Sequence, residues 1–176
     1  QVDGIEDVAR LDAMQGTHVS RTAQPLRVSV RVNPASGISE RAAIIGGGGP
    51  SAFGVDEEDL DEFVRDASAY QHVQITGVQV FAASNELDAD ILLRNHATAL
   101  GIGRRMATRH GIDLELIDIG GGLGIRYAES EAALDVEALG VGLEALLAEH
   151  DWYFEYSDDF RIWRVGSDQR KAIKAL

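Results

Sequence analysis

The stretch that decides the fold is Leu114–Tyr127, LELIDIGGGLGIRY. Its first part, Leu114–Ile119, is mostly apolar and is predicted to form a β-strand. The strand runs directly into Gly120–Gly124, GGGLG. Glycines lack the side chains that would keep a ligand away, so the N–H groups of such a segment can surround a phosphate. The pattern indicates either an anion-binding loop at the end of a strand or only a tight turn into a helix.

Two nucleotide-binding motifs match this glycine segment in part. As a dinucleotide fingerprint, its glycines give GxGxG without the final spacing. A methyltransferase loop also begins as strand-Asp-x-Gly-x-Gly-x-Gly, but that fold needs a helix straight after the loop and then a strand that ends in an acidic residue. Here Arg126, Tyr127 and the polar stretch Ala128–Ala132 follow instead. An S-adenosylmethionine-dependent methyltransferase stays open as an alternative function.

Strands and helices are predicted to alternate along the rest of the chain. Leu26–Asn33, LRVSVRVN, alternates apolar and polar residues and stops at Pro34, which is typical of a strand, and Val73–Ala82 gives another. This order of elements favours an α/β fold built of parallel β/α units. Apolar residues at helical spacing predict helices over Val2–Met14 (after a short strand end), Asp56–Ala69, Leu87–His110 and Val136–Glu149.

Three segments are less regular. Ala35–Val55 is predicted to be a loop because of its glycines and proline. The carboxylates of Asp56–Asp59 are expected in the first turn of a helix, where the helix dipole favours them. The tail changes in composition, and we expect strands at Trp152–Tyr156 and Phe160–Val165 followed by a short helix. Residues 1–150 are therefore predicted to form one unit and residues 151–176 a divergent tail.

The composition limits the function classes. The chain has 176 residues, 45% of them hydrophobic, which suffices for one domain with a buried core. The net charge of −13 disfavours nucleic acid and anionic membranes as partners, and no apolar run is long enough to span a bilayer. Cysteine is absent, which excludes disulfides and thiolate metal sites and fits a cytoplasmic enzyme. No metal site is predicted, because none of the histidines has metal-ligand spacing: His18, His72, His96, His110 and His150.

Three segments occur in an order that is specific to a known family. They are SVRVNP with GGGGPSAFGVD, then ITGVQVFAASNELDA, then DIGGGLGIRY with ALDVEAL. Together they resemble the alanine-racemase-type (fold type III) pyridoxal-phosphate-dependent decarboxylases, the group of diaminopimelate and ornithine decarboxylases. The resemblance covers roughly Val2–Glu149 and is nearest to the branch that acts on carrier-protein-bound aminoacyl groups. It implies part of a TIM-type (β/α)8 barrel, with parallel strands alternating with helices.

The resemblance implies roles for four residues at the cofactor phosphate. Gly120, Gly121 and Gly122 match the glycines that hold the phosphate of pyridoxal 5′-phosphate through backbone N–H groups. Ser84, in the AASN segment, matches a serine that binds the same phosphate.

Three more residues are implied at the cofactor ring. Arg31 matches an arginine on the strand beneath the ring, and Phe81 stands where many members stack a histidine on it. Glu155 matches the acid that pairs with the pyridine nitrogen and keeps it protonated, so that the ring acts as an electron sink. Gln79 departs from the pattern, because a second histidine is common at its position.

The resemblance places the covalent chemistry outside these residues. The family's Schiff-base lysine lies on the first barrel strand, which we expect ahead of Gln1, and the catalytic residues of the C-terminal β-domain are expected elsewhere too. The two lysines present, Lys171 and Lys174, lie in a region that matches no such role. No catalytic residue is assigned, and the chain alone is expected to be inactive.

The expected function is pyridoxal-phosphate-dependent decarboxylation. The partner would be a small amino-acid substrate or a carrier-protein-bound aminoacyl group, with no nucleic-acid or membrane partner. Enzymes of this family are usually homodimers. The other function left open is that of a non-catalytic relative that keeps the phosphate pocket and lacks the lysine.

Overall fold

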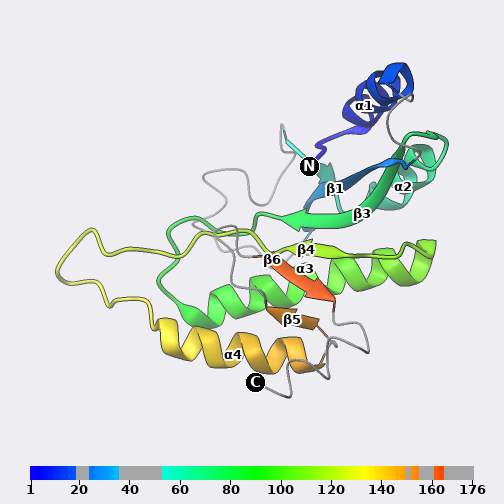
Figure 1. The fold of residues 1–176 in the computed structure, drawn as a ribbon. Coiled ribbons are helices and arrows are strands. Elements are labelled where there is room, and N and C mark those ends of the chain that lie inside the picture. Colours follow the sequence, from blue (N-terminus) through cyan, green and yellow to red (C-terminus); the bar gives the residue numbers. More distant parts are fainter. Residues whose placement is uncertain (19–23, 36–52, 150–151, 155–160, 165–176) are drawn as a thin grey trace.

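The structure is a computed structural model that describes residues 1–18, 24–35, 53–149, 152–154 and 161–164. Helices and strands alternate along most of the chain, as the sequence predicts (Figure 1). In order, the elements are α1 Ile5–His18, β1 Leu26–Asn33, β2 Val55–Asp56, α2 Leu60–Ala67, β3 Val73–Val80, α3 Ala89–His110, β4 Leu116–Asp118, α4 Val136–Glu149, β5 Trp152–Phe154 and β6 Arg161–Arg164.

The strands form one sheet with the order β2-β1-β3-β4-β6-β5. β1 pairs in parallel with both β2 and β3, and β3 pairs in parallel with β4. This half of the sheet confirms the predicted parallel β/α units. The tail departs from the parallel order, because β6 pairs antiparallel with both β4 and β5. The two tail strands are present where they were predicted, and the predicted tail helix lies outside the described residues.

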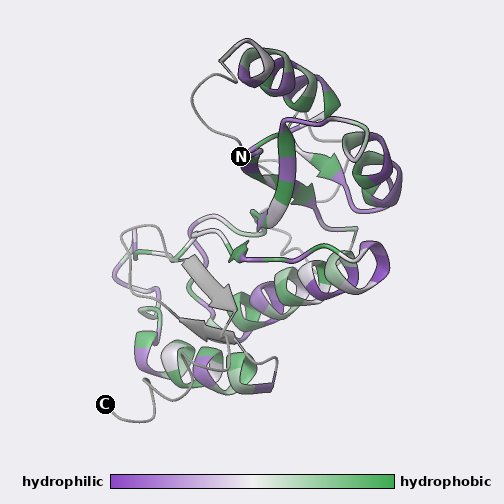
Figure 2. Ribbon diagram, turned by 45° about the vertical axis from the view of Figure 1, so that its right-hand side comes forward, coloured by the Kyte–Doolittle hydropathy of each residue, from purple (hydrophilic) through white to green (hydrophobic). Residues whose placement is uncertain are grey.

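The two faces of the parallel strands differ in character. Along β1 the valines Val28, Val30 and Val32 are buried, whereas Arg27 is exposed and Arg31 only half-buried. Helices cover the apolar face: α1 and α2 lie together beside β1 and β3, and α3 and α4 lie together below β4 (Figure 1). Hydrophobic and hydrophilic residues alternate around α1, α2 and α3 (Figure 2), as expected of helices that bury one stripe against a sheet.

The sheet register places residues of neighbouring strands side by side on the other face. Ser29 of β1 lies beside Gly77 of β3, and Gly77 beside Leu116 of β4. Nearer the carboxyl ends of the strands, Arg31 lies beside Gln79, and Gln79 beside Asp118. These last three side chains form what we call the polar row, which lies at the carboxyl ends of the strands.

The prediction for Asp56–Asp59 was wrong. Helix α2 begins only at Leu60, so these carboxylates precede its first turn. Asp56 belongs to β2, a two-residue strand that adds to the edge of β1, and the Asn33 side chain donates to its carboxylate at 3.1 Å. The acidic residues of the first turn of α2 are instead Asp61 and Glu62.

Both ends of helix α3 are defined by capping residues. The Asp88 side chain accepts hydrogen bonds from the N–H groups of Asp90 and Ile91, which starts the helix at Ala89. Gly111 ends it in the left-handed region, with φ at 64°. Among the helices of the described residues, none combines the length and the hydrophobicity that a membrane span needs.

Two glycines inside α3 make a matched pair for testing how α3 packs on β4. A β-carbon on Gly103 would lie 2.6 Å from Cδ1 of Ile117, which is fully buried, whereas one on Gly101 would come no closer than 3.5 Å to the Arg105 side chain. Gly101→Ala should stabilise the chain by up to about 1 kcal/mol, because alanine favours helix more than glycine does. In Gly103→Ala the same gain should be offset by overpacking of about 1–3 kcal/mol. Urea unfolding measures both free energies, and equal values would contradict this packing.

The buried histidine of α3 should make stability depend on pH. His96 is 5% exposed, and its burial lowers the pKa from 6.5 to about 4. As pH falls, the unfolded chain therefore binds a proton at this side chain before the folded chain does. The contribution of His96 to the free energy of unfolding should be at its maximum above about pH 6.5. It should fall by up to about 3 kcal/mol as pH decreases to about 4. His96→Gln should make unfolding curves in that interval less dependent on pH, and an unchanged slope would show that other groups cause the loss.

Candidate functional site

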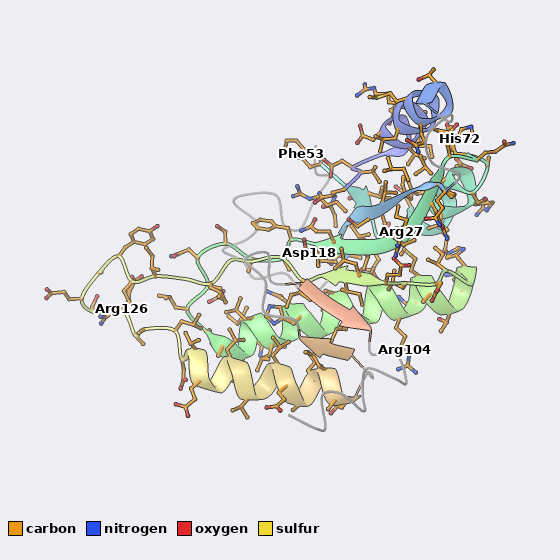
Figure 3. The ribbon with its side chains drawn as sticks, in the orientation of Figure 1. Arg27, Phe53, His72, Arg104, Asp118 and Arg126 are labelled. Carbon is orange, nitrogen blue, oxygen red and sulfur yellow. The ribbon has the colours of Figure 1, made fainter. Side chains whose placement is uncertain are left out.

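The candidate site lies at the carboxyl ends of β1, β3 and β4. In open or closed parallel sheets these ends meet at one edge, where ligands bind among the connecting loops. The polar row of Arg31, Gln79 and Asp118 reaches this edge. Figure 3 shows Asp118 at the end of β4, where the chain turns into the glycine segment.

Arg31 lies between two aromatic rings. Its guanidinium carbon is 5.6 Å from the centre of the Phe53 ring and 5.8 Å from that of Phe81, both within the range of a cation–π contact. The buried Nε of Arg31 has no hydrogen-bond partner. Phe53 itself is 59% exposed, so the aromatic pair forms part of an accessible edge rather than of the core.

Gln79 contributes a second unpaired polar atom. Its side chain is 8% exposed, and its Oε1 has no hydrogen-bond partner. Because Gln79 and Arg31 are register neighbours, an unpaired acceptor and an unpaired donor lie on adjacent strands at the same level. Buried polar groups are rarely left unpaired, so this position favours a polar ligand.

The glycine segment passes against the loop that follows β3. A β-carbon on Gly120 would lie 2.6 Å from the Val80 carbonyl oxygen, and one on Gly124 would lie 2.6 Å from that of Glu86. One on Gly122 would overlap the Ala83 carbonyl oxygen. Gly120 and Gly122 also have φ values of 71° and 87°, which side chains rarely tolerate. These glycines are therefore needed for backbone contact between the two loops.

Gly121 differs from the glycines on either side of it. It is exposed, it has no positive φ, and a β-carbon there would meet no atom within 4 Å. The structure describes no hydrogen bond to its N–H group or to that of Gly122. The Gly120 N–H is already engaged, because it donates to the Asp118 carboxylate at 2.8 Å. Open space and available N–H groups therefore coincide at Gly121.

The loop between β3 and α3 fastens the glycine segment in place. The Glu86 N–H donates to the Gly122 carbonyl at 2.8 Å, and the Gly124 N–H donates back to the Glu86 carbonyl at 2.8 Å. The Asn85 side chain accepts a hydrogen bond from the Ile125 N–H at 3.0 Å. Ser84 immediately precedes these residues, and its backbone nitrogen would lie 3.3 Å from a β-carbon on Gly122.

The structure thus gathers six of the seven sequence-predicted site residues at one edge of the sheet, in two groups. Arg31 and Phe81 lie in contact, and Ser84 lies beside the segment that holds Gly120, Gly121 and Gly122. Glu155 lies outside the described residues.

Sequence reasoning missed three residues at this edge: Phe53, Asn85 and Asp118. Phe53 is close in space to Arg31 but far from it in the chain, so no local pattern indicates the contact. For Asn85 a weak signal exists, because asparagine is the residue other than glycine that most readily takes a left-handed turn. Among the described residues, no three histidine or carboxylate side chains cluster closely enough to hold a metal ion.

Comparison with known proteins identifies the family. The family described as pyridoxal-dependent decarboxylase, pyridoxal binding domain, matches residues 4–164. The chain is 34% identical over 110 residues to the L-glutamyl-(BtrI acyl-carrier protein) decarboxylase of Niallia circulans, which covers 62% of this chain and 26% of that protein. It is 32% identical over 130 residues to the diaminopimelate decarboxylase of Thermoplasma acidophilum, which covers 74% of this chain and 31% of that one.

A solved structure shows the same fold. A single-residue mutant of the diaminopimelate decarboxylase of Helicobacter pylori, complexed with L-lysine, superposes with a TM-score of 0.68 at 22% identity, over 84% of this chain and 36% of that one. The chain thus spans about a quarter to a third of the length of these relatives. Since the family match extends over almost all of its residues, the chain belongs to the pyridoxal-dependent decarboxylases, within their pyridoxal-binding barrel domain.

Proposed function

We propose that this chain forms the phosphate-binding side of the cofactor site in a pyridoxal-phosphate-dependent decarboxylase. The proposal depends on one observation at the carboxyl edge of the parallel sheet. There is open space at Gly121, and the N–H groups of Gly121 and Gly122 are unpaired among the described residues. Ser84, whose backbone nitrogen lies beside the same segment, carries a hydroxyl that can serve as a further donor. Together they offer the neutral donors and close backbone approach that a phosphate dianion needs.

The residues present fit the rest of the cofactor as well. The Phe81 ring offers a flat apolar face to a planar pyridine, and the Arg31 guanidinium lies against that phenylalanine with its Nε unpaired. The Gln79 Oε1 adds an unpaired acceptor on the neighbouring strand. The site therefore has phosphate donors at one end and an aromatic and polar lining at the other.

Within this arrangement each residue has a specific task. The N–H groups of Gly121 and Gly122 and the hydroxyl of Ser84 bind the phosphate, which fixes the position of the ring. Phe81 restricts the ring to one plane and excludes water from its face, and Arg31 orients Phe81 through the cation–π contact. When bound, pyridoxal phosphate supplies the electron sink that stabilises the carbanion left after carbon dioxide departs.

The activity, substrate and partners of the whole protein are part of the proposal. We propose an amino acid or a carrier-protein-bound aminoacyl group as the substrate, supported by the relative from Niallia circulans, whose name states a carrier-protein substrate. The two lysines of the chain, Lys171 and Lys174, lie outside the described residues, so the proposal assigns no residue as the covalent anchor of the cofactor. A homodimer in the cytoplasm is the expected working form.

Two neighbouring glycines separate cofactor binding from folding. Gly121→Ala places a methyl group in the open space of the loop without strain, so it should weaken binding of pyridoxamine 5′-phosphate about ten-fold or more and leave the thermal midpoint unchanged. This ligand, measured by isothermal calorimetry, has an amine in place of the aldehyde and so forms no adventitious imine with Lys171 or Lys174.

Gly122→Ala is the matched comparison. Its methyl group would overlap the Ala83 carbonyl at a positive φ, so it should lower the thermal midpoint as well as the affinity. Undiminished binding by the stable Gly121→Ala chain would place the phosphate elsewhere and overturn the proposed function of this loop.

A further inference from the structure

Asn85 is the one residue other than glycine, within the described ranges, that has a positive φ. Its φ is 52°, in the left-handed region that asparagine tolerates better than most residues but that still strains the backbone. Such strain persists only where the surrounding structure fixes it, and it concentrates at binding sites. Asn85 lies directly between Ser84 and Glu86, in the loop that contacts the glycine segment.

The left-handed turn at Asn85 brings two successive residues into contact with the glycine segment. Through its side chain Asn85 accepts from the Ile125 N–H at 3.0 Å. Through its backbone Glu86 donates to the Gly122 carbonyl and accepts from the Gly124 N–H, both at 2.8 Å. These three hydrogen bonds fix the carboxyl side of the segment, while the bond from Gly120 N–H to Asp118 fixes the amino side. Gly121 is left between two fixed points.

Glu86 extends this anchoring to helix α3. Its side chain is 4% exposed, and its Oε1 accepts from the N–H groups of Leu87 and Asp88 at 3.0 and 3.1 Å. Asp88 in turn caps the helix. The turn at Asn85 is thus held on one side by a well-formed helix end, so it forms a rigid support for the glycine segment.

We propose that Asn85 is a positioning residue that presents the Gly121 and Gly122 N–H groups to the cofactor phosphate, and so makes the site selective for the phosphorylated form of the cofactor. This inference rests on the proposed function. Asn85 acts only through the segment that it holds and contacts no ligand atom itself. Its effect should therefore depend on whether the ligand carries a phosphate.

The test compares two ligands that differ only in the phosphate, pyridoxamine 5′-phosphate and pyridoxamine, on the full 176-residue chain. Asn85→Gly keeps the left-handed backbone accessible and removes the side-chain acceptor. It should raise the Kd for pyridoxamine 5′-phosphate by about five- to ten-fold, as expected from losing one hydrogen bond, and change the Kd for pyridoxamine less than about two-fold. Hydrogen exchange of the Ile125 amide should become faster.

Ser130→Gly is the matched control, because it introduces the same residue at an exposed turn of the segment after Tyr127. It should leave both affinities unchanged. Asn85→Gly with unchanged affinity for both ligands, or with equal losses for both, would overturn the positioning role and leave the proposed function standing. If the unsubstituted chain bound neither ligand, both proposals would fail together.

Discussion

The backbones of the β3–α3 and β4–α4 loops lie so close together that three positions of the glycine segment leave no room for a β-carbon. At Gly120, Gly122 and Gly124 that space is taken by carbonyl oxygens of the opposite loop. The contact requires parallel β3 and β4 to end at the same level, and it explains why every second residue of GGGLG, at positions 120, 122 and 124, is a glycine. It also leaves Gly121 as the position where a ligand can approach the backbone. The candidate site depends on this one approach of main chain to main chain.

The sheet separates stability from function by alternating its two faces. The valines of β1 and β3 and Ile117 of β4 face the helices and are fully or nearly fully buried. On the opposite face, the same strands carry the polar row, in which Arg31 and Gln79 have unpaired atoms. Since adjacent residues of a strand point to opposite faces, a shift of register by one residue would exchange the two sets. The pairing that builds the core therefore also positions the polar row.

Sequence reasoning succeeded where the signal is local. Leu26–Asn33 and Val136–Glu149 were predicted with the observed bounds, because strict alternation followed by proline, and leucines at helical spacing, are sufficient signals by themselves. The start of α2 was misplaced because Asp56 is recruited into β2 by pairing with β1, a contact between distant segments. The strand β6 was predicted, but its antiparallel direction depends on which strand edge is available, and no pattern in the tail indicates that direction.

The candidate site shows the same division. Six of the site residues that the resemblance implied lie at one edge of the sheet: Arg31, Phe81, Ser84 and Gly120–Gly122. A family pattern can place them together because it carries spatial information that composition lacks. The family pattern did not indicate Phe53 and Asn85, because their roles arise from geometry. The Phe53 ring lies against the Arg31 guanidinium, and Asn85 forms a left-handed turn beside the glycine segment. Gln79 was noticed only as a departure from the family pattern, and its unpaired Oε1 becomes evident once the register places it beside Arg31.

Amide chemical-shift mapping of the chain with pyridoxamine 5′-phosphate would show whether the phosphate binds at the glycine segment. We expect the largest shifts at the backbone N–H groups of Gly121, Gly122 and Ser84. The arginines of α3 are the natural alternative for an anion on this acidic chain, and Arg105 and Arg109 already pair with Glu57 and Asp61 there. Largest shifts at these arginines, or no shifts in the glycine segment at saturating ligand, would contradict the assignment of the phosphate site.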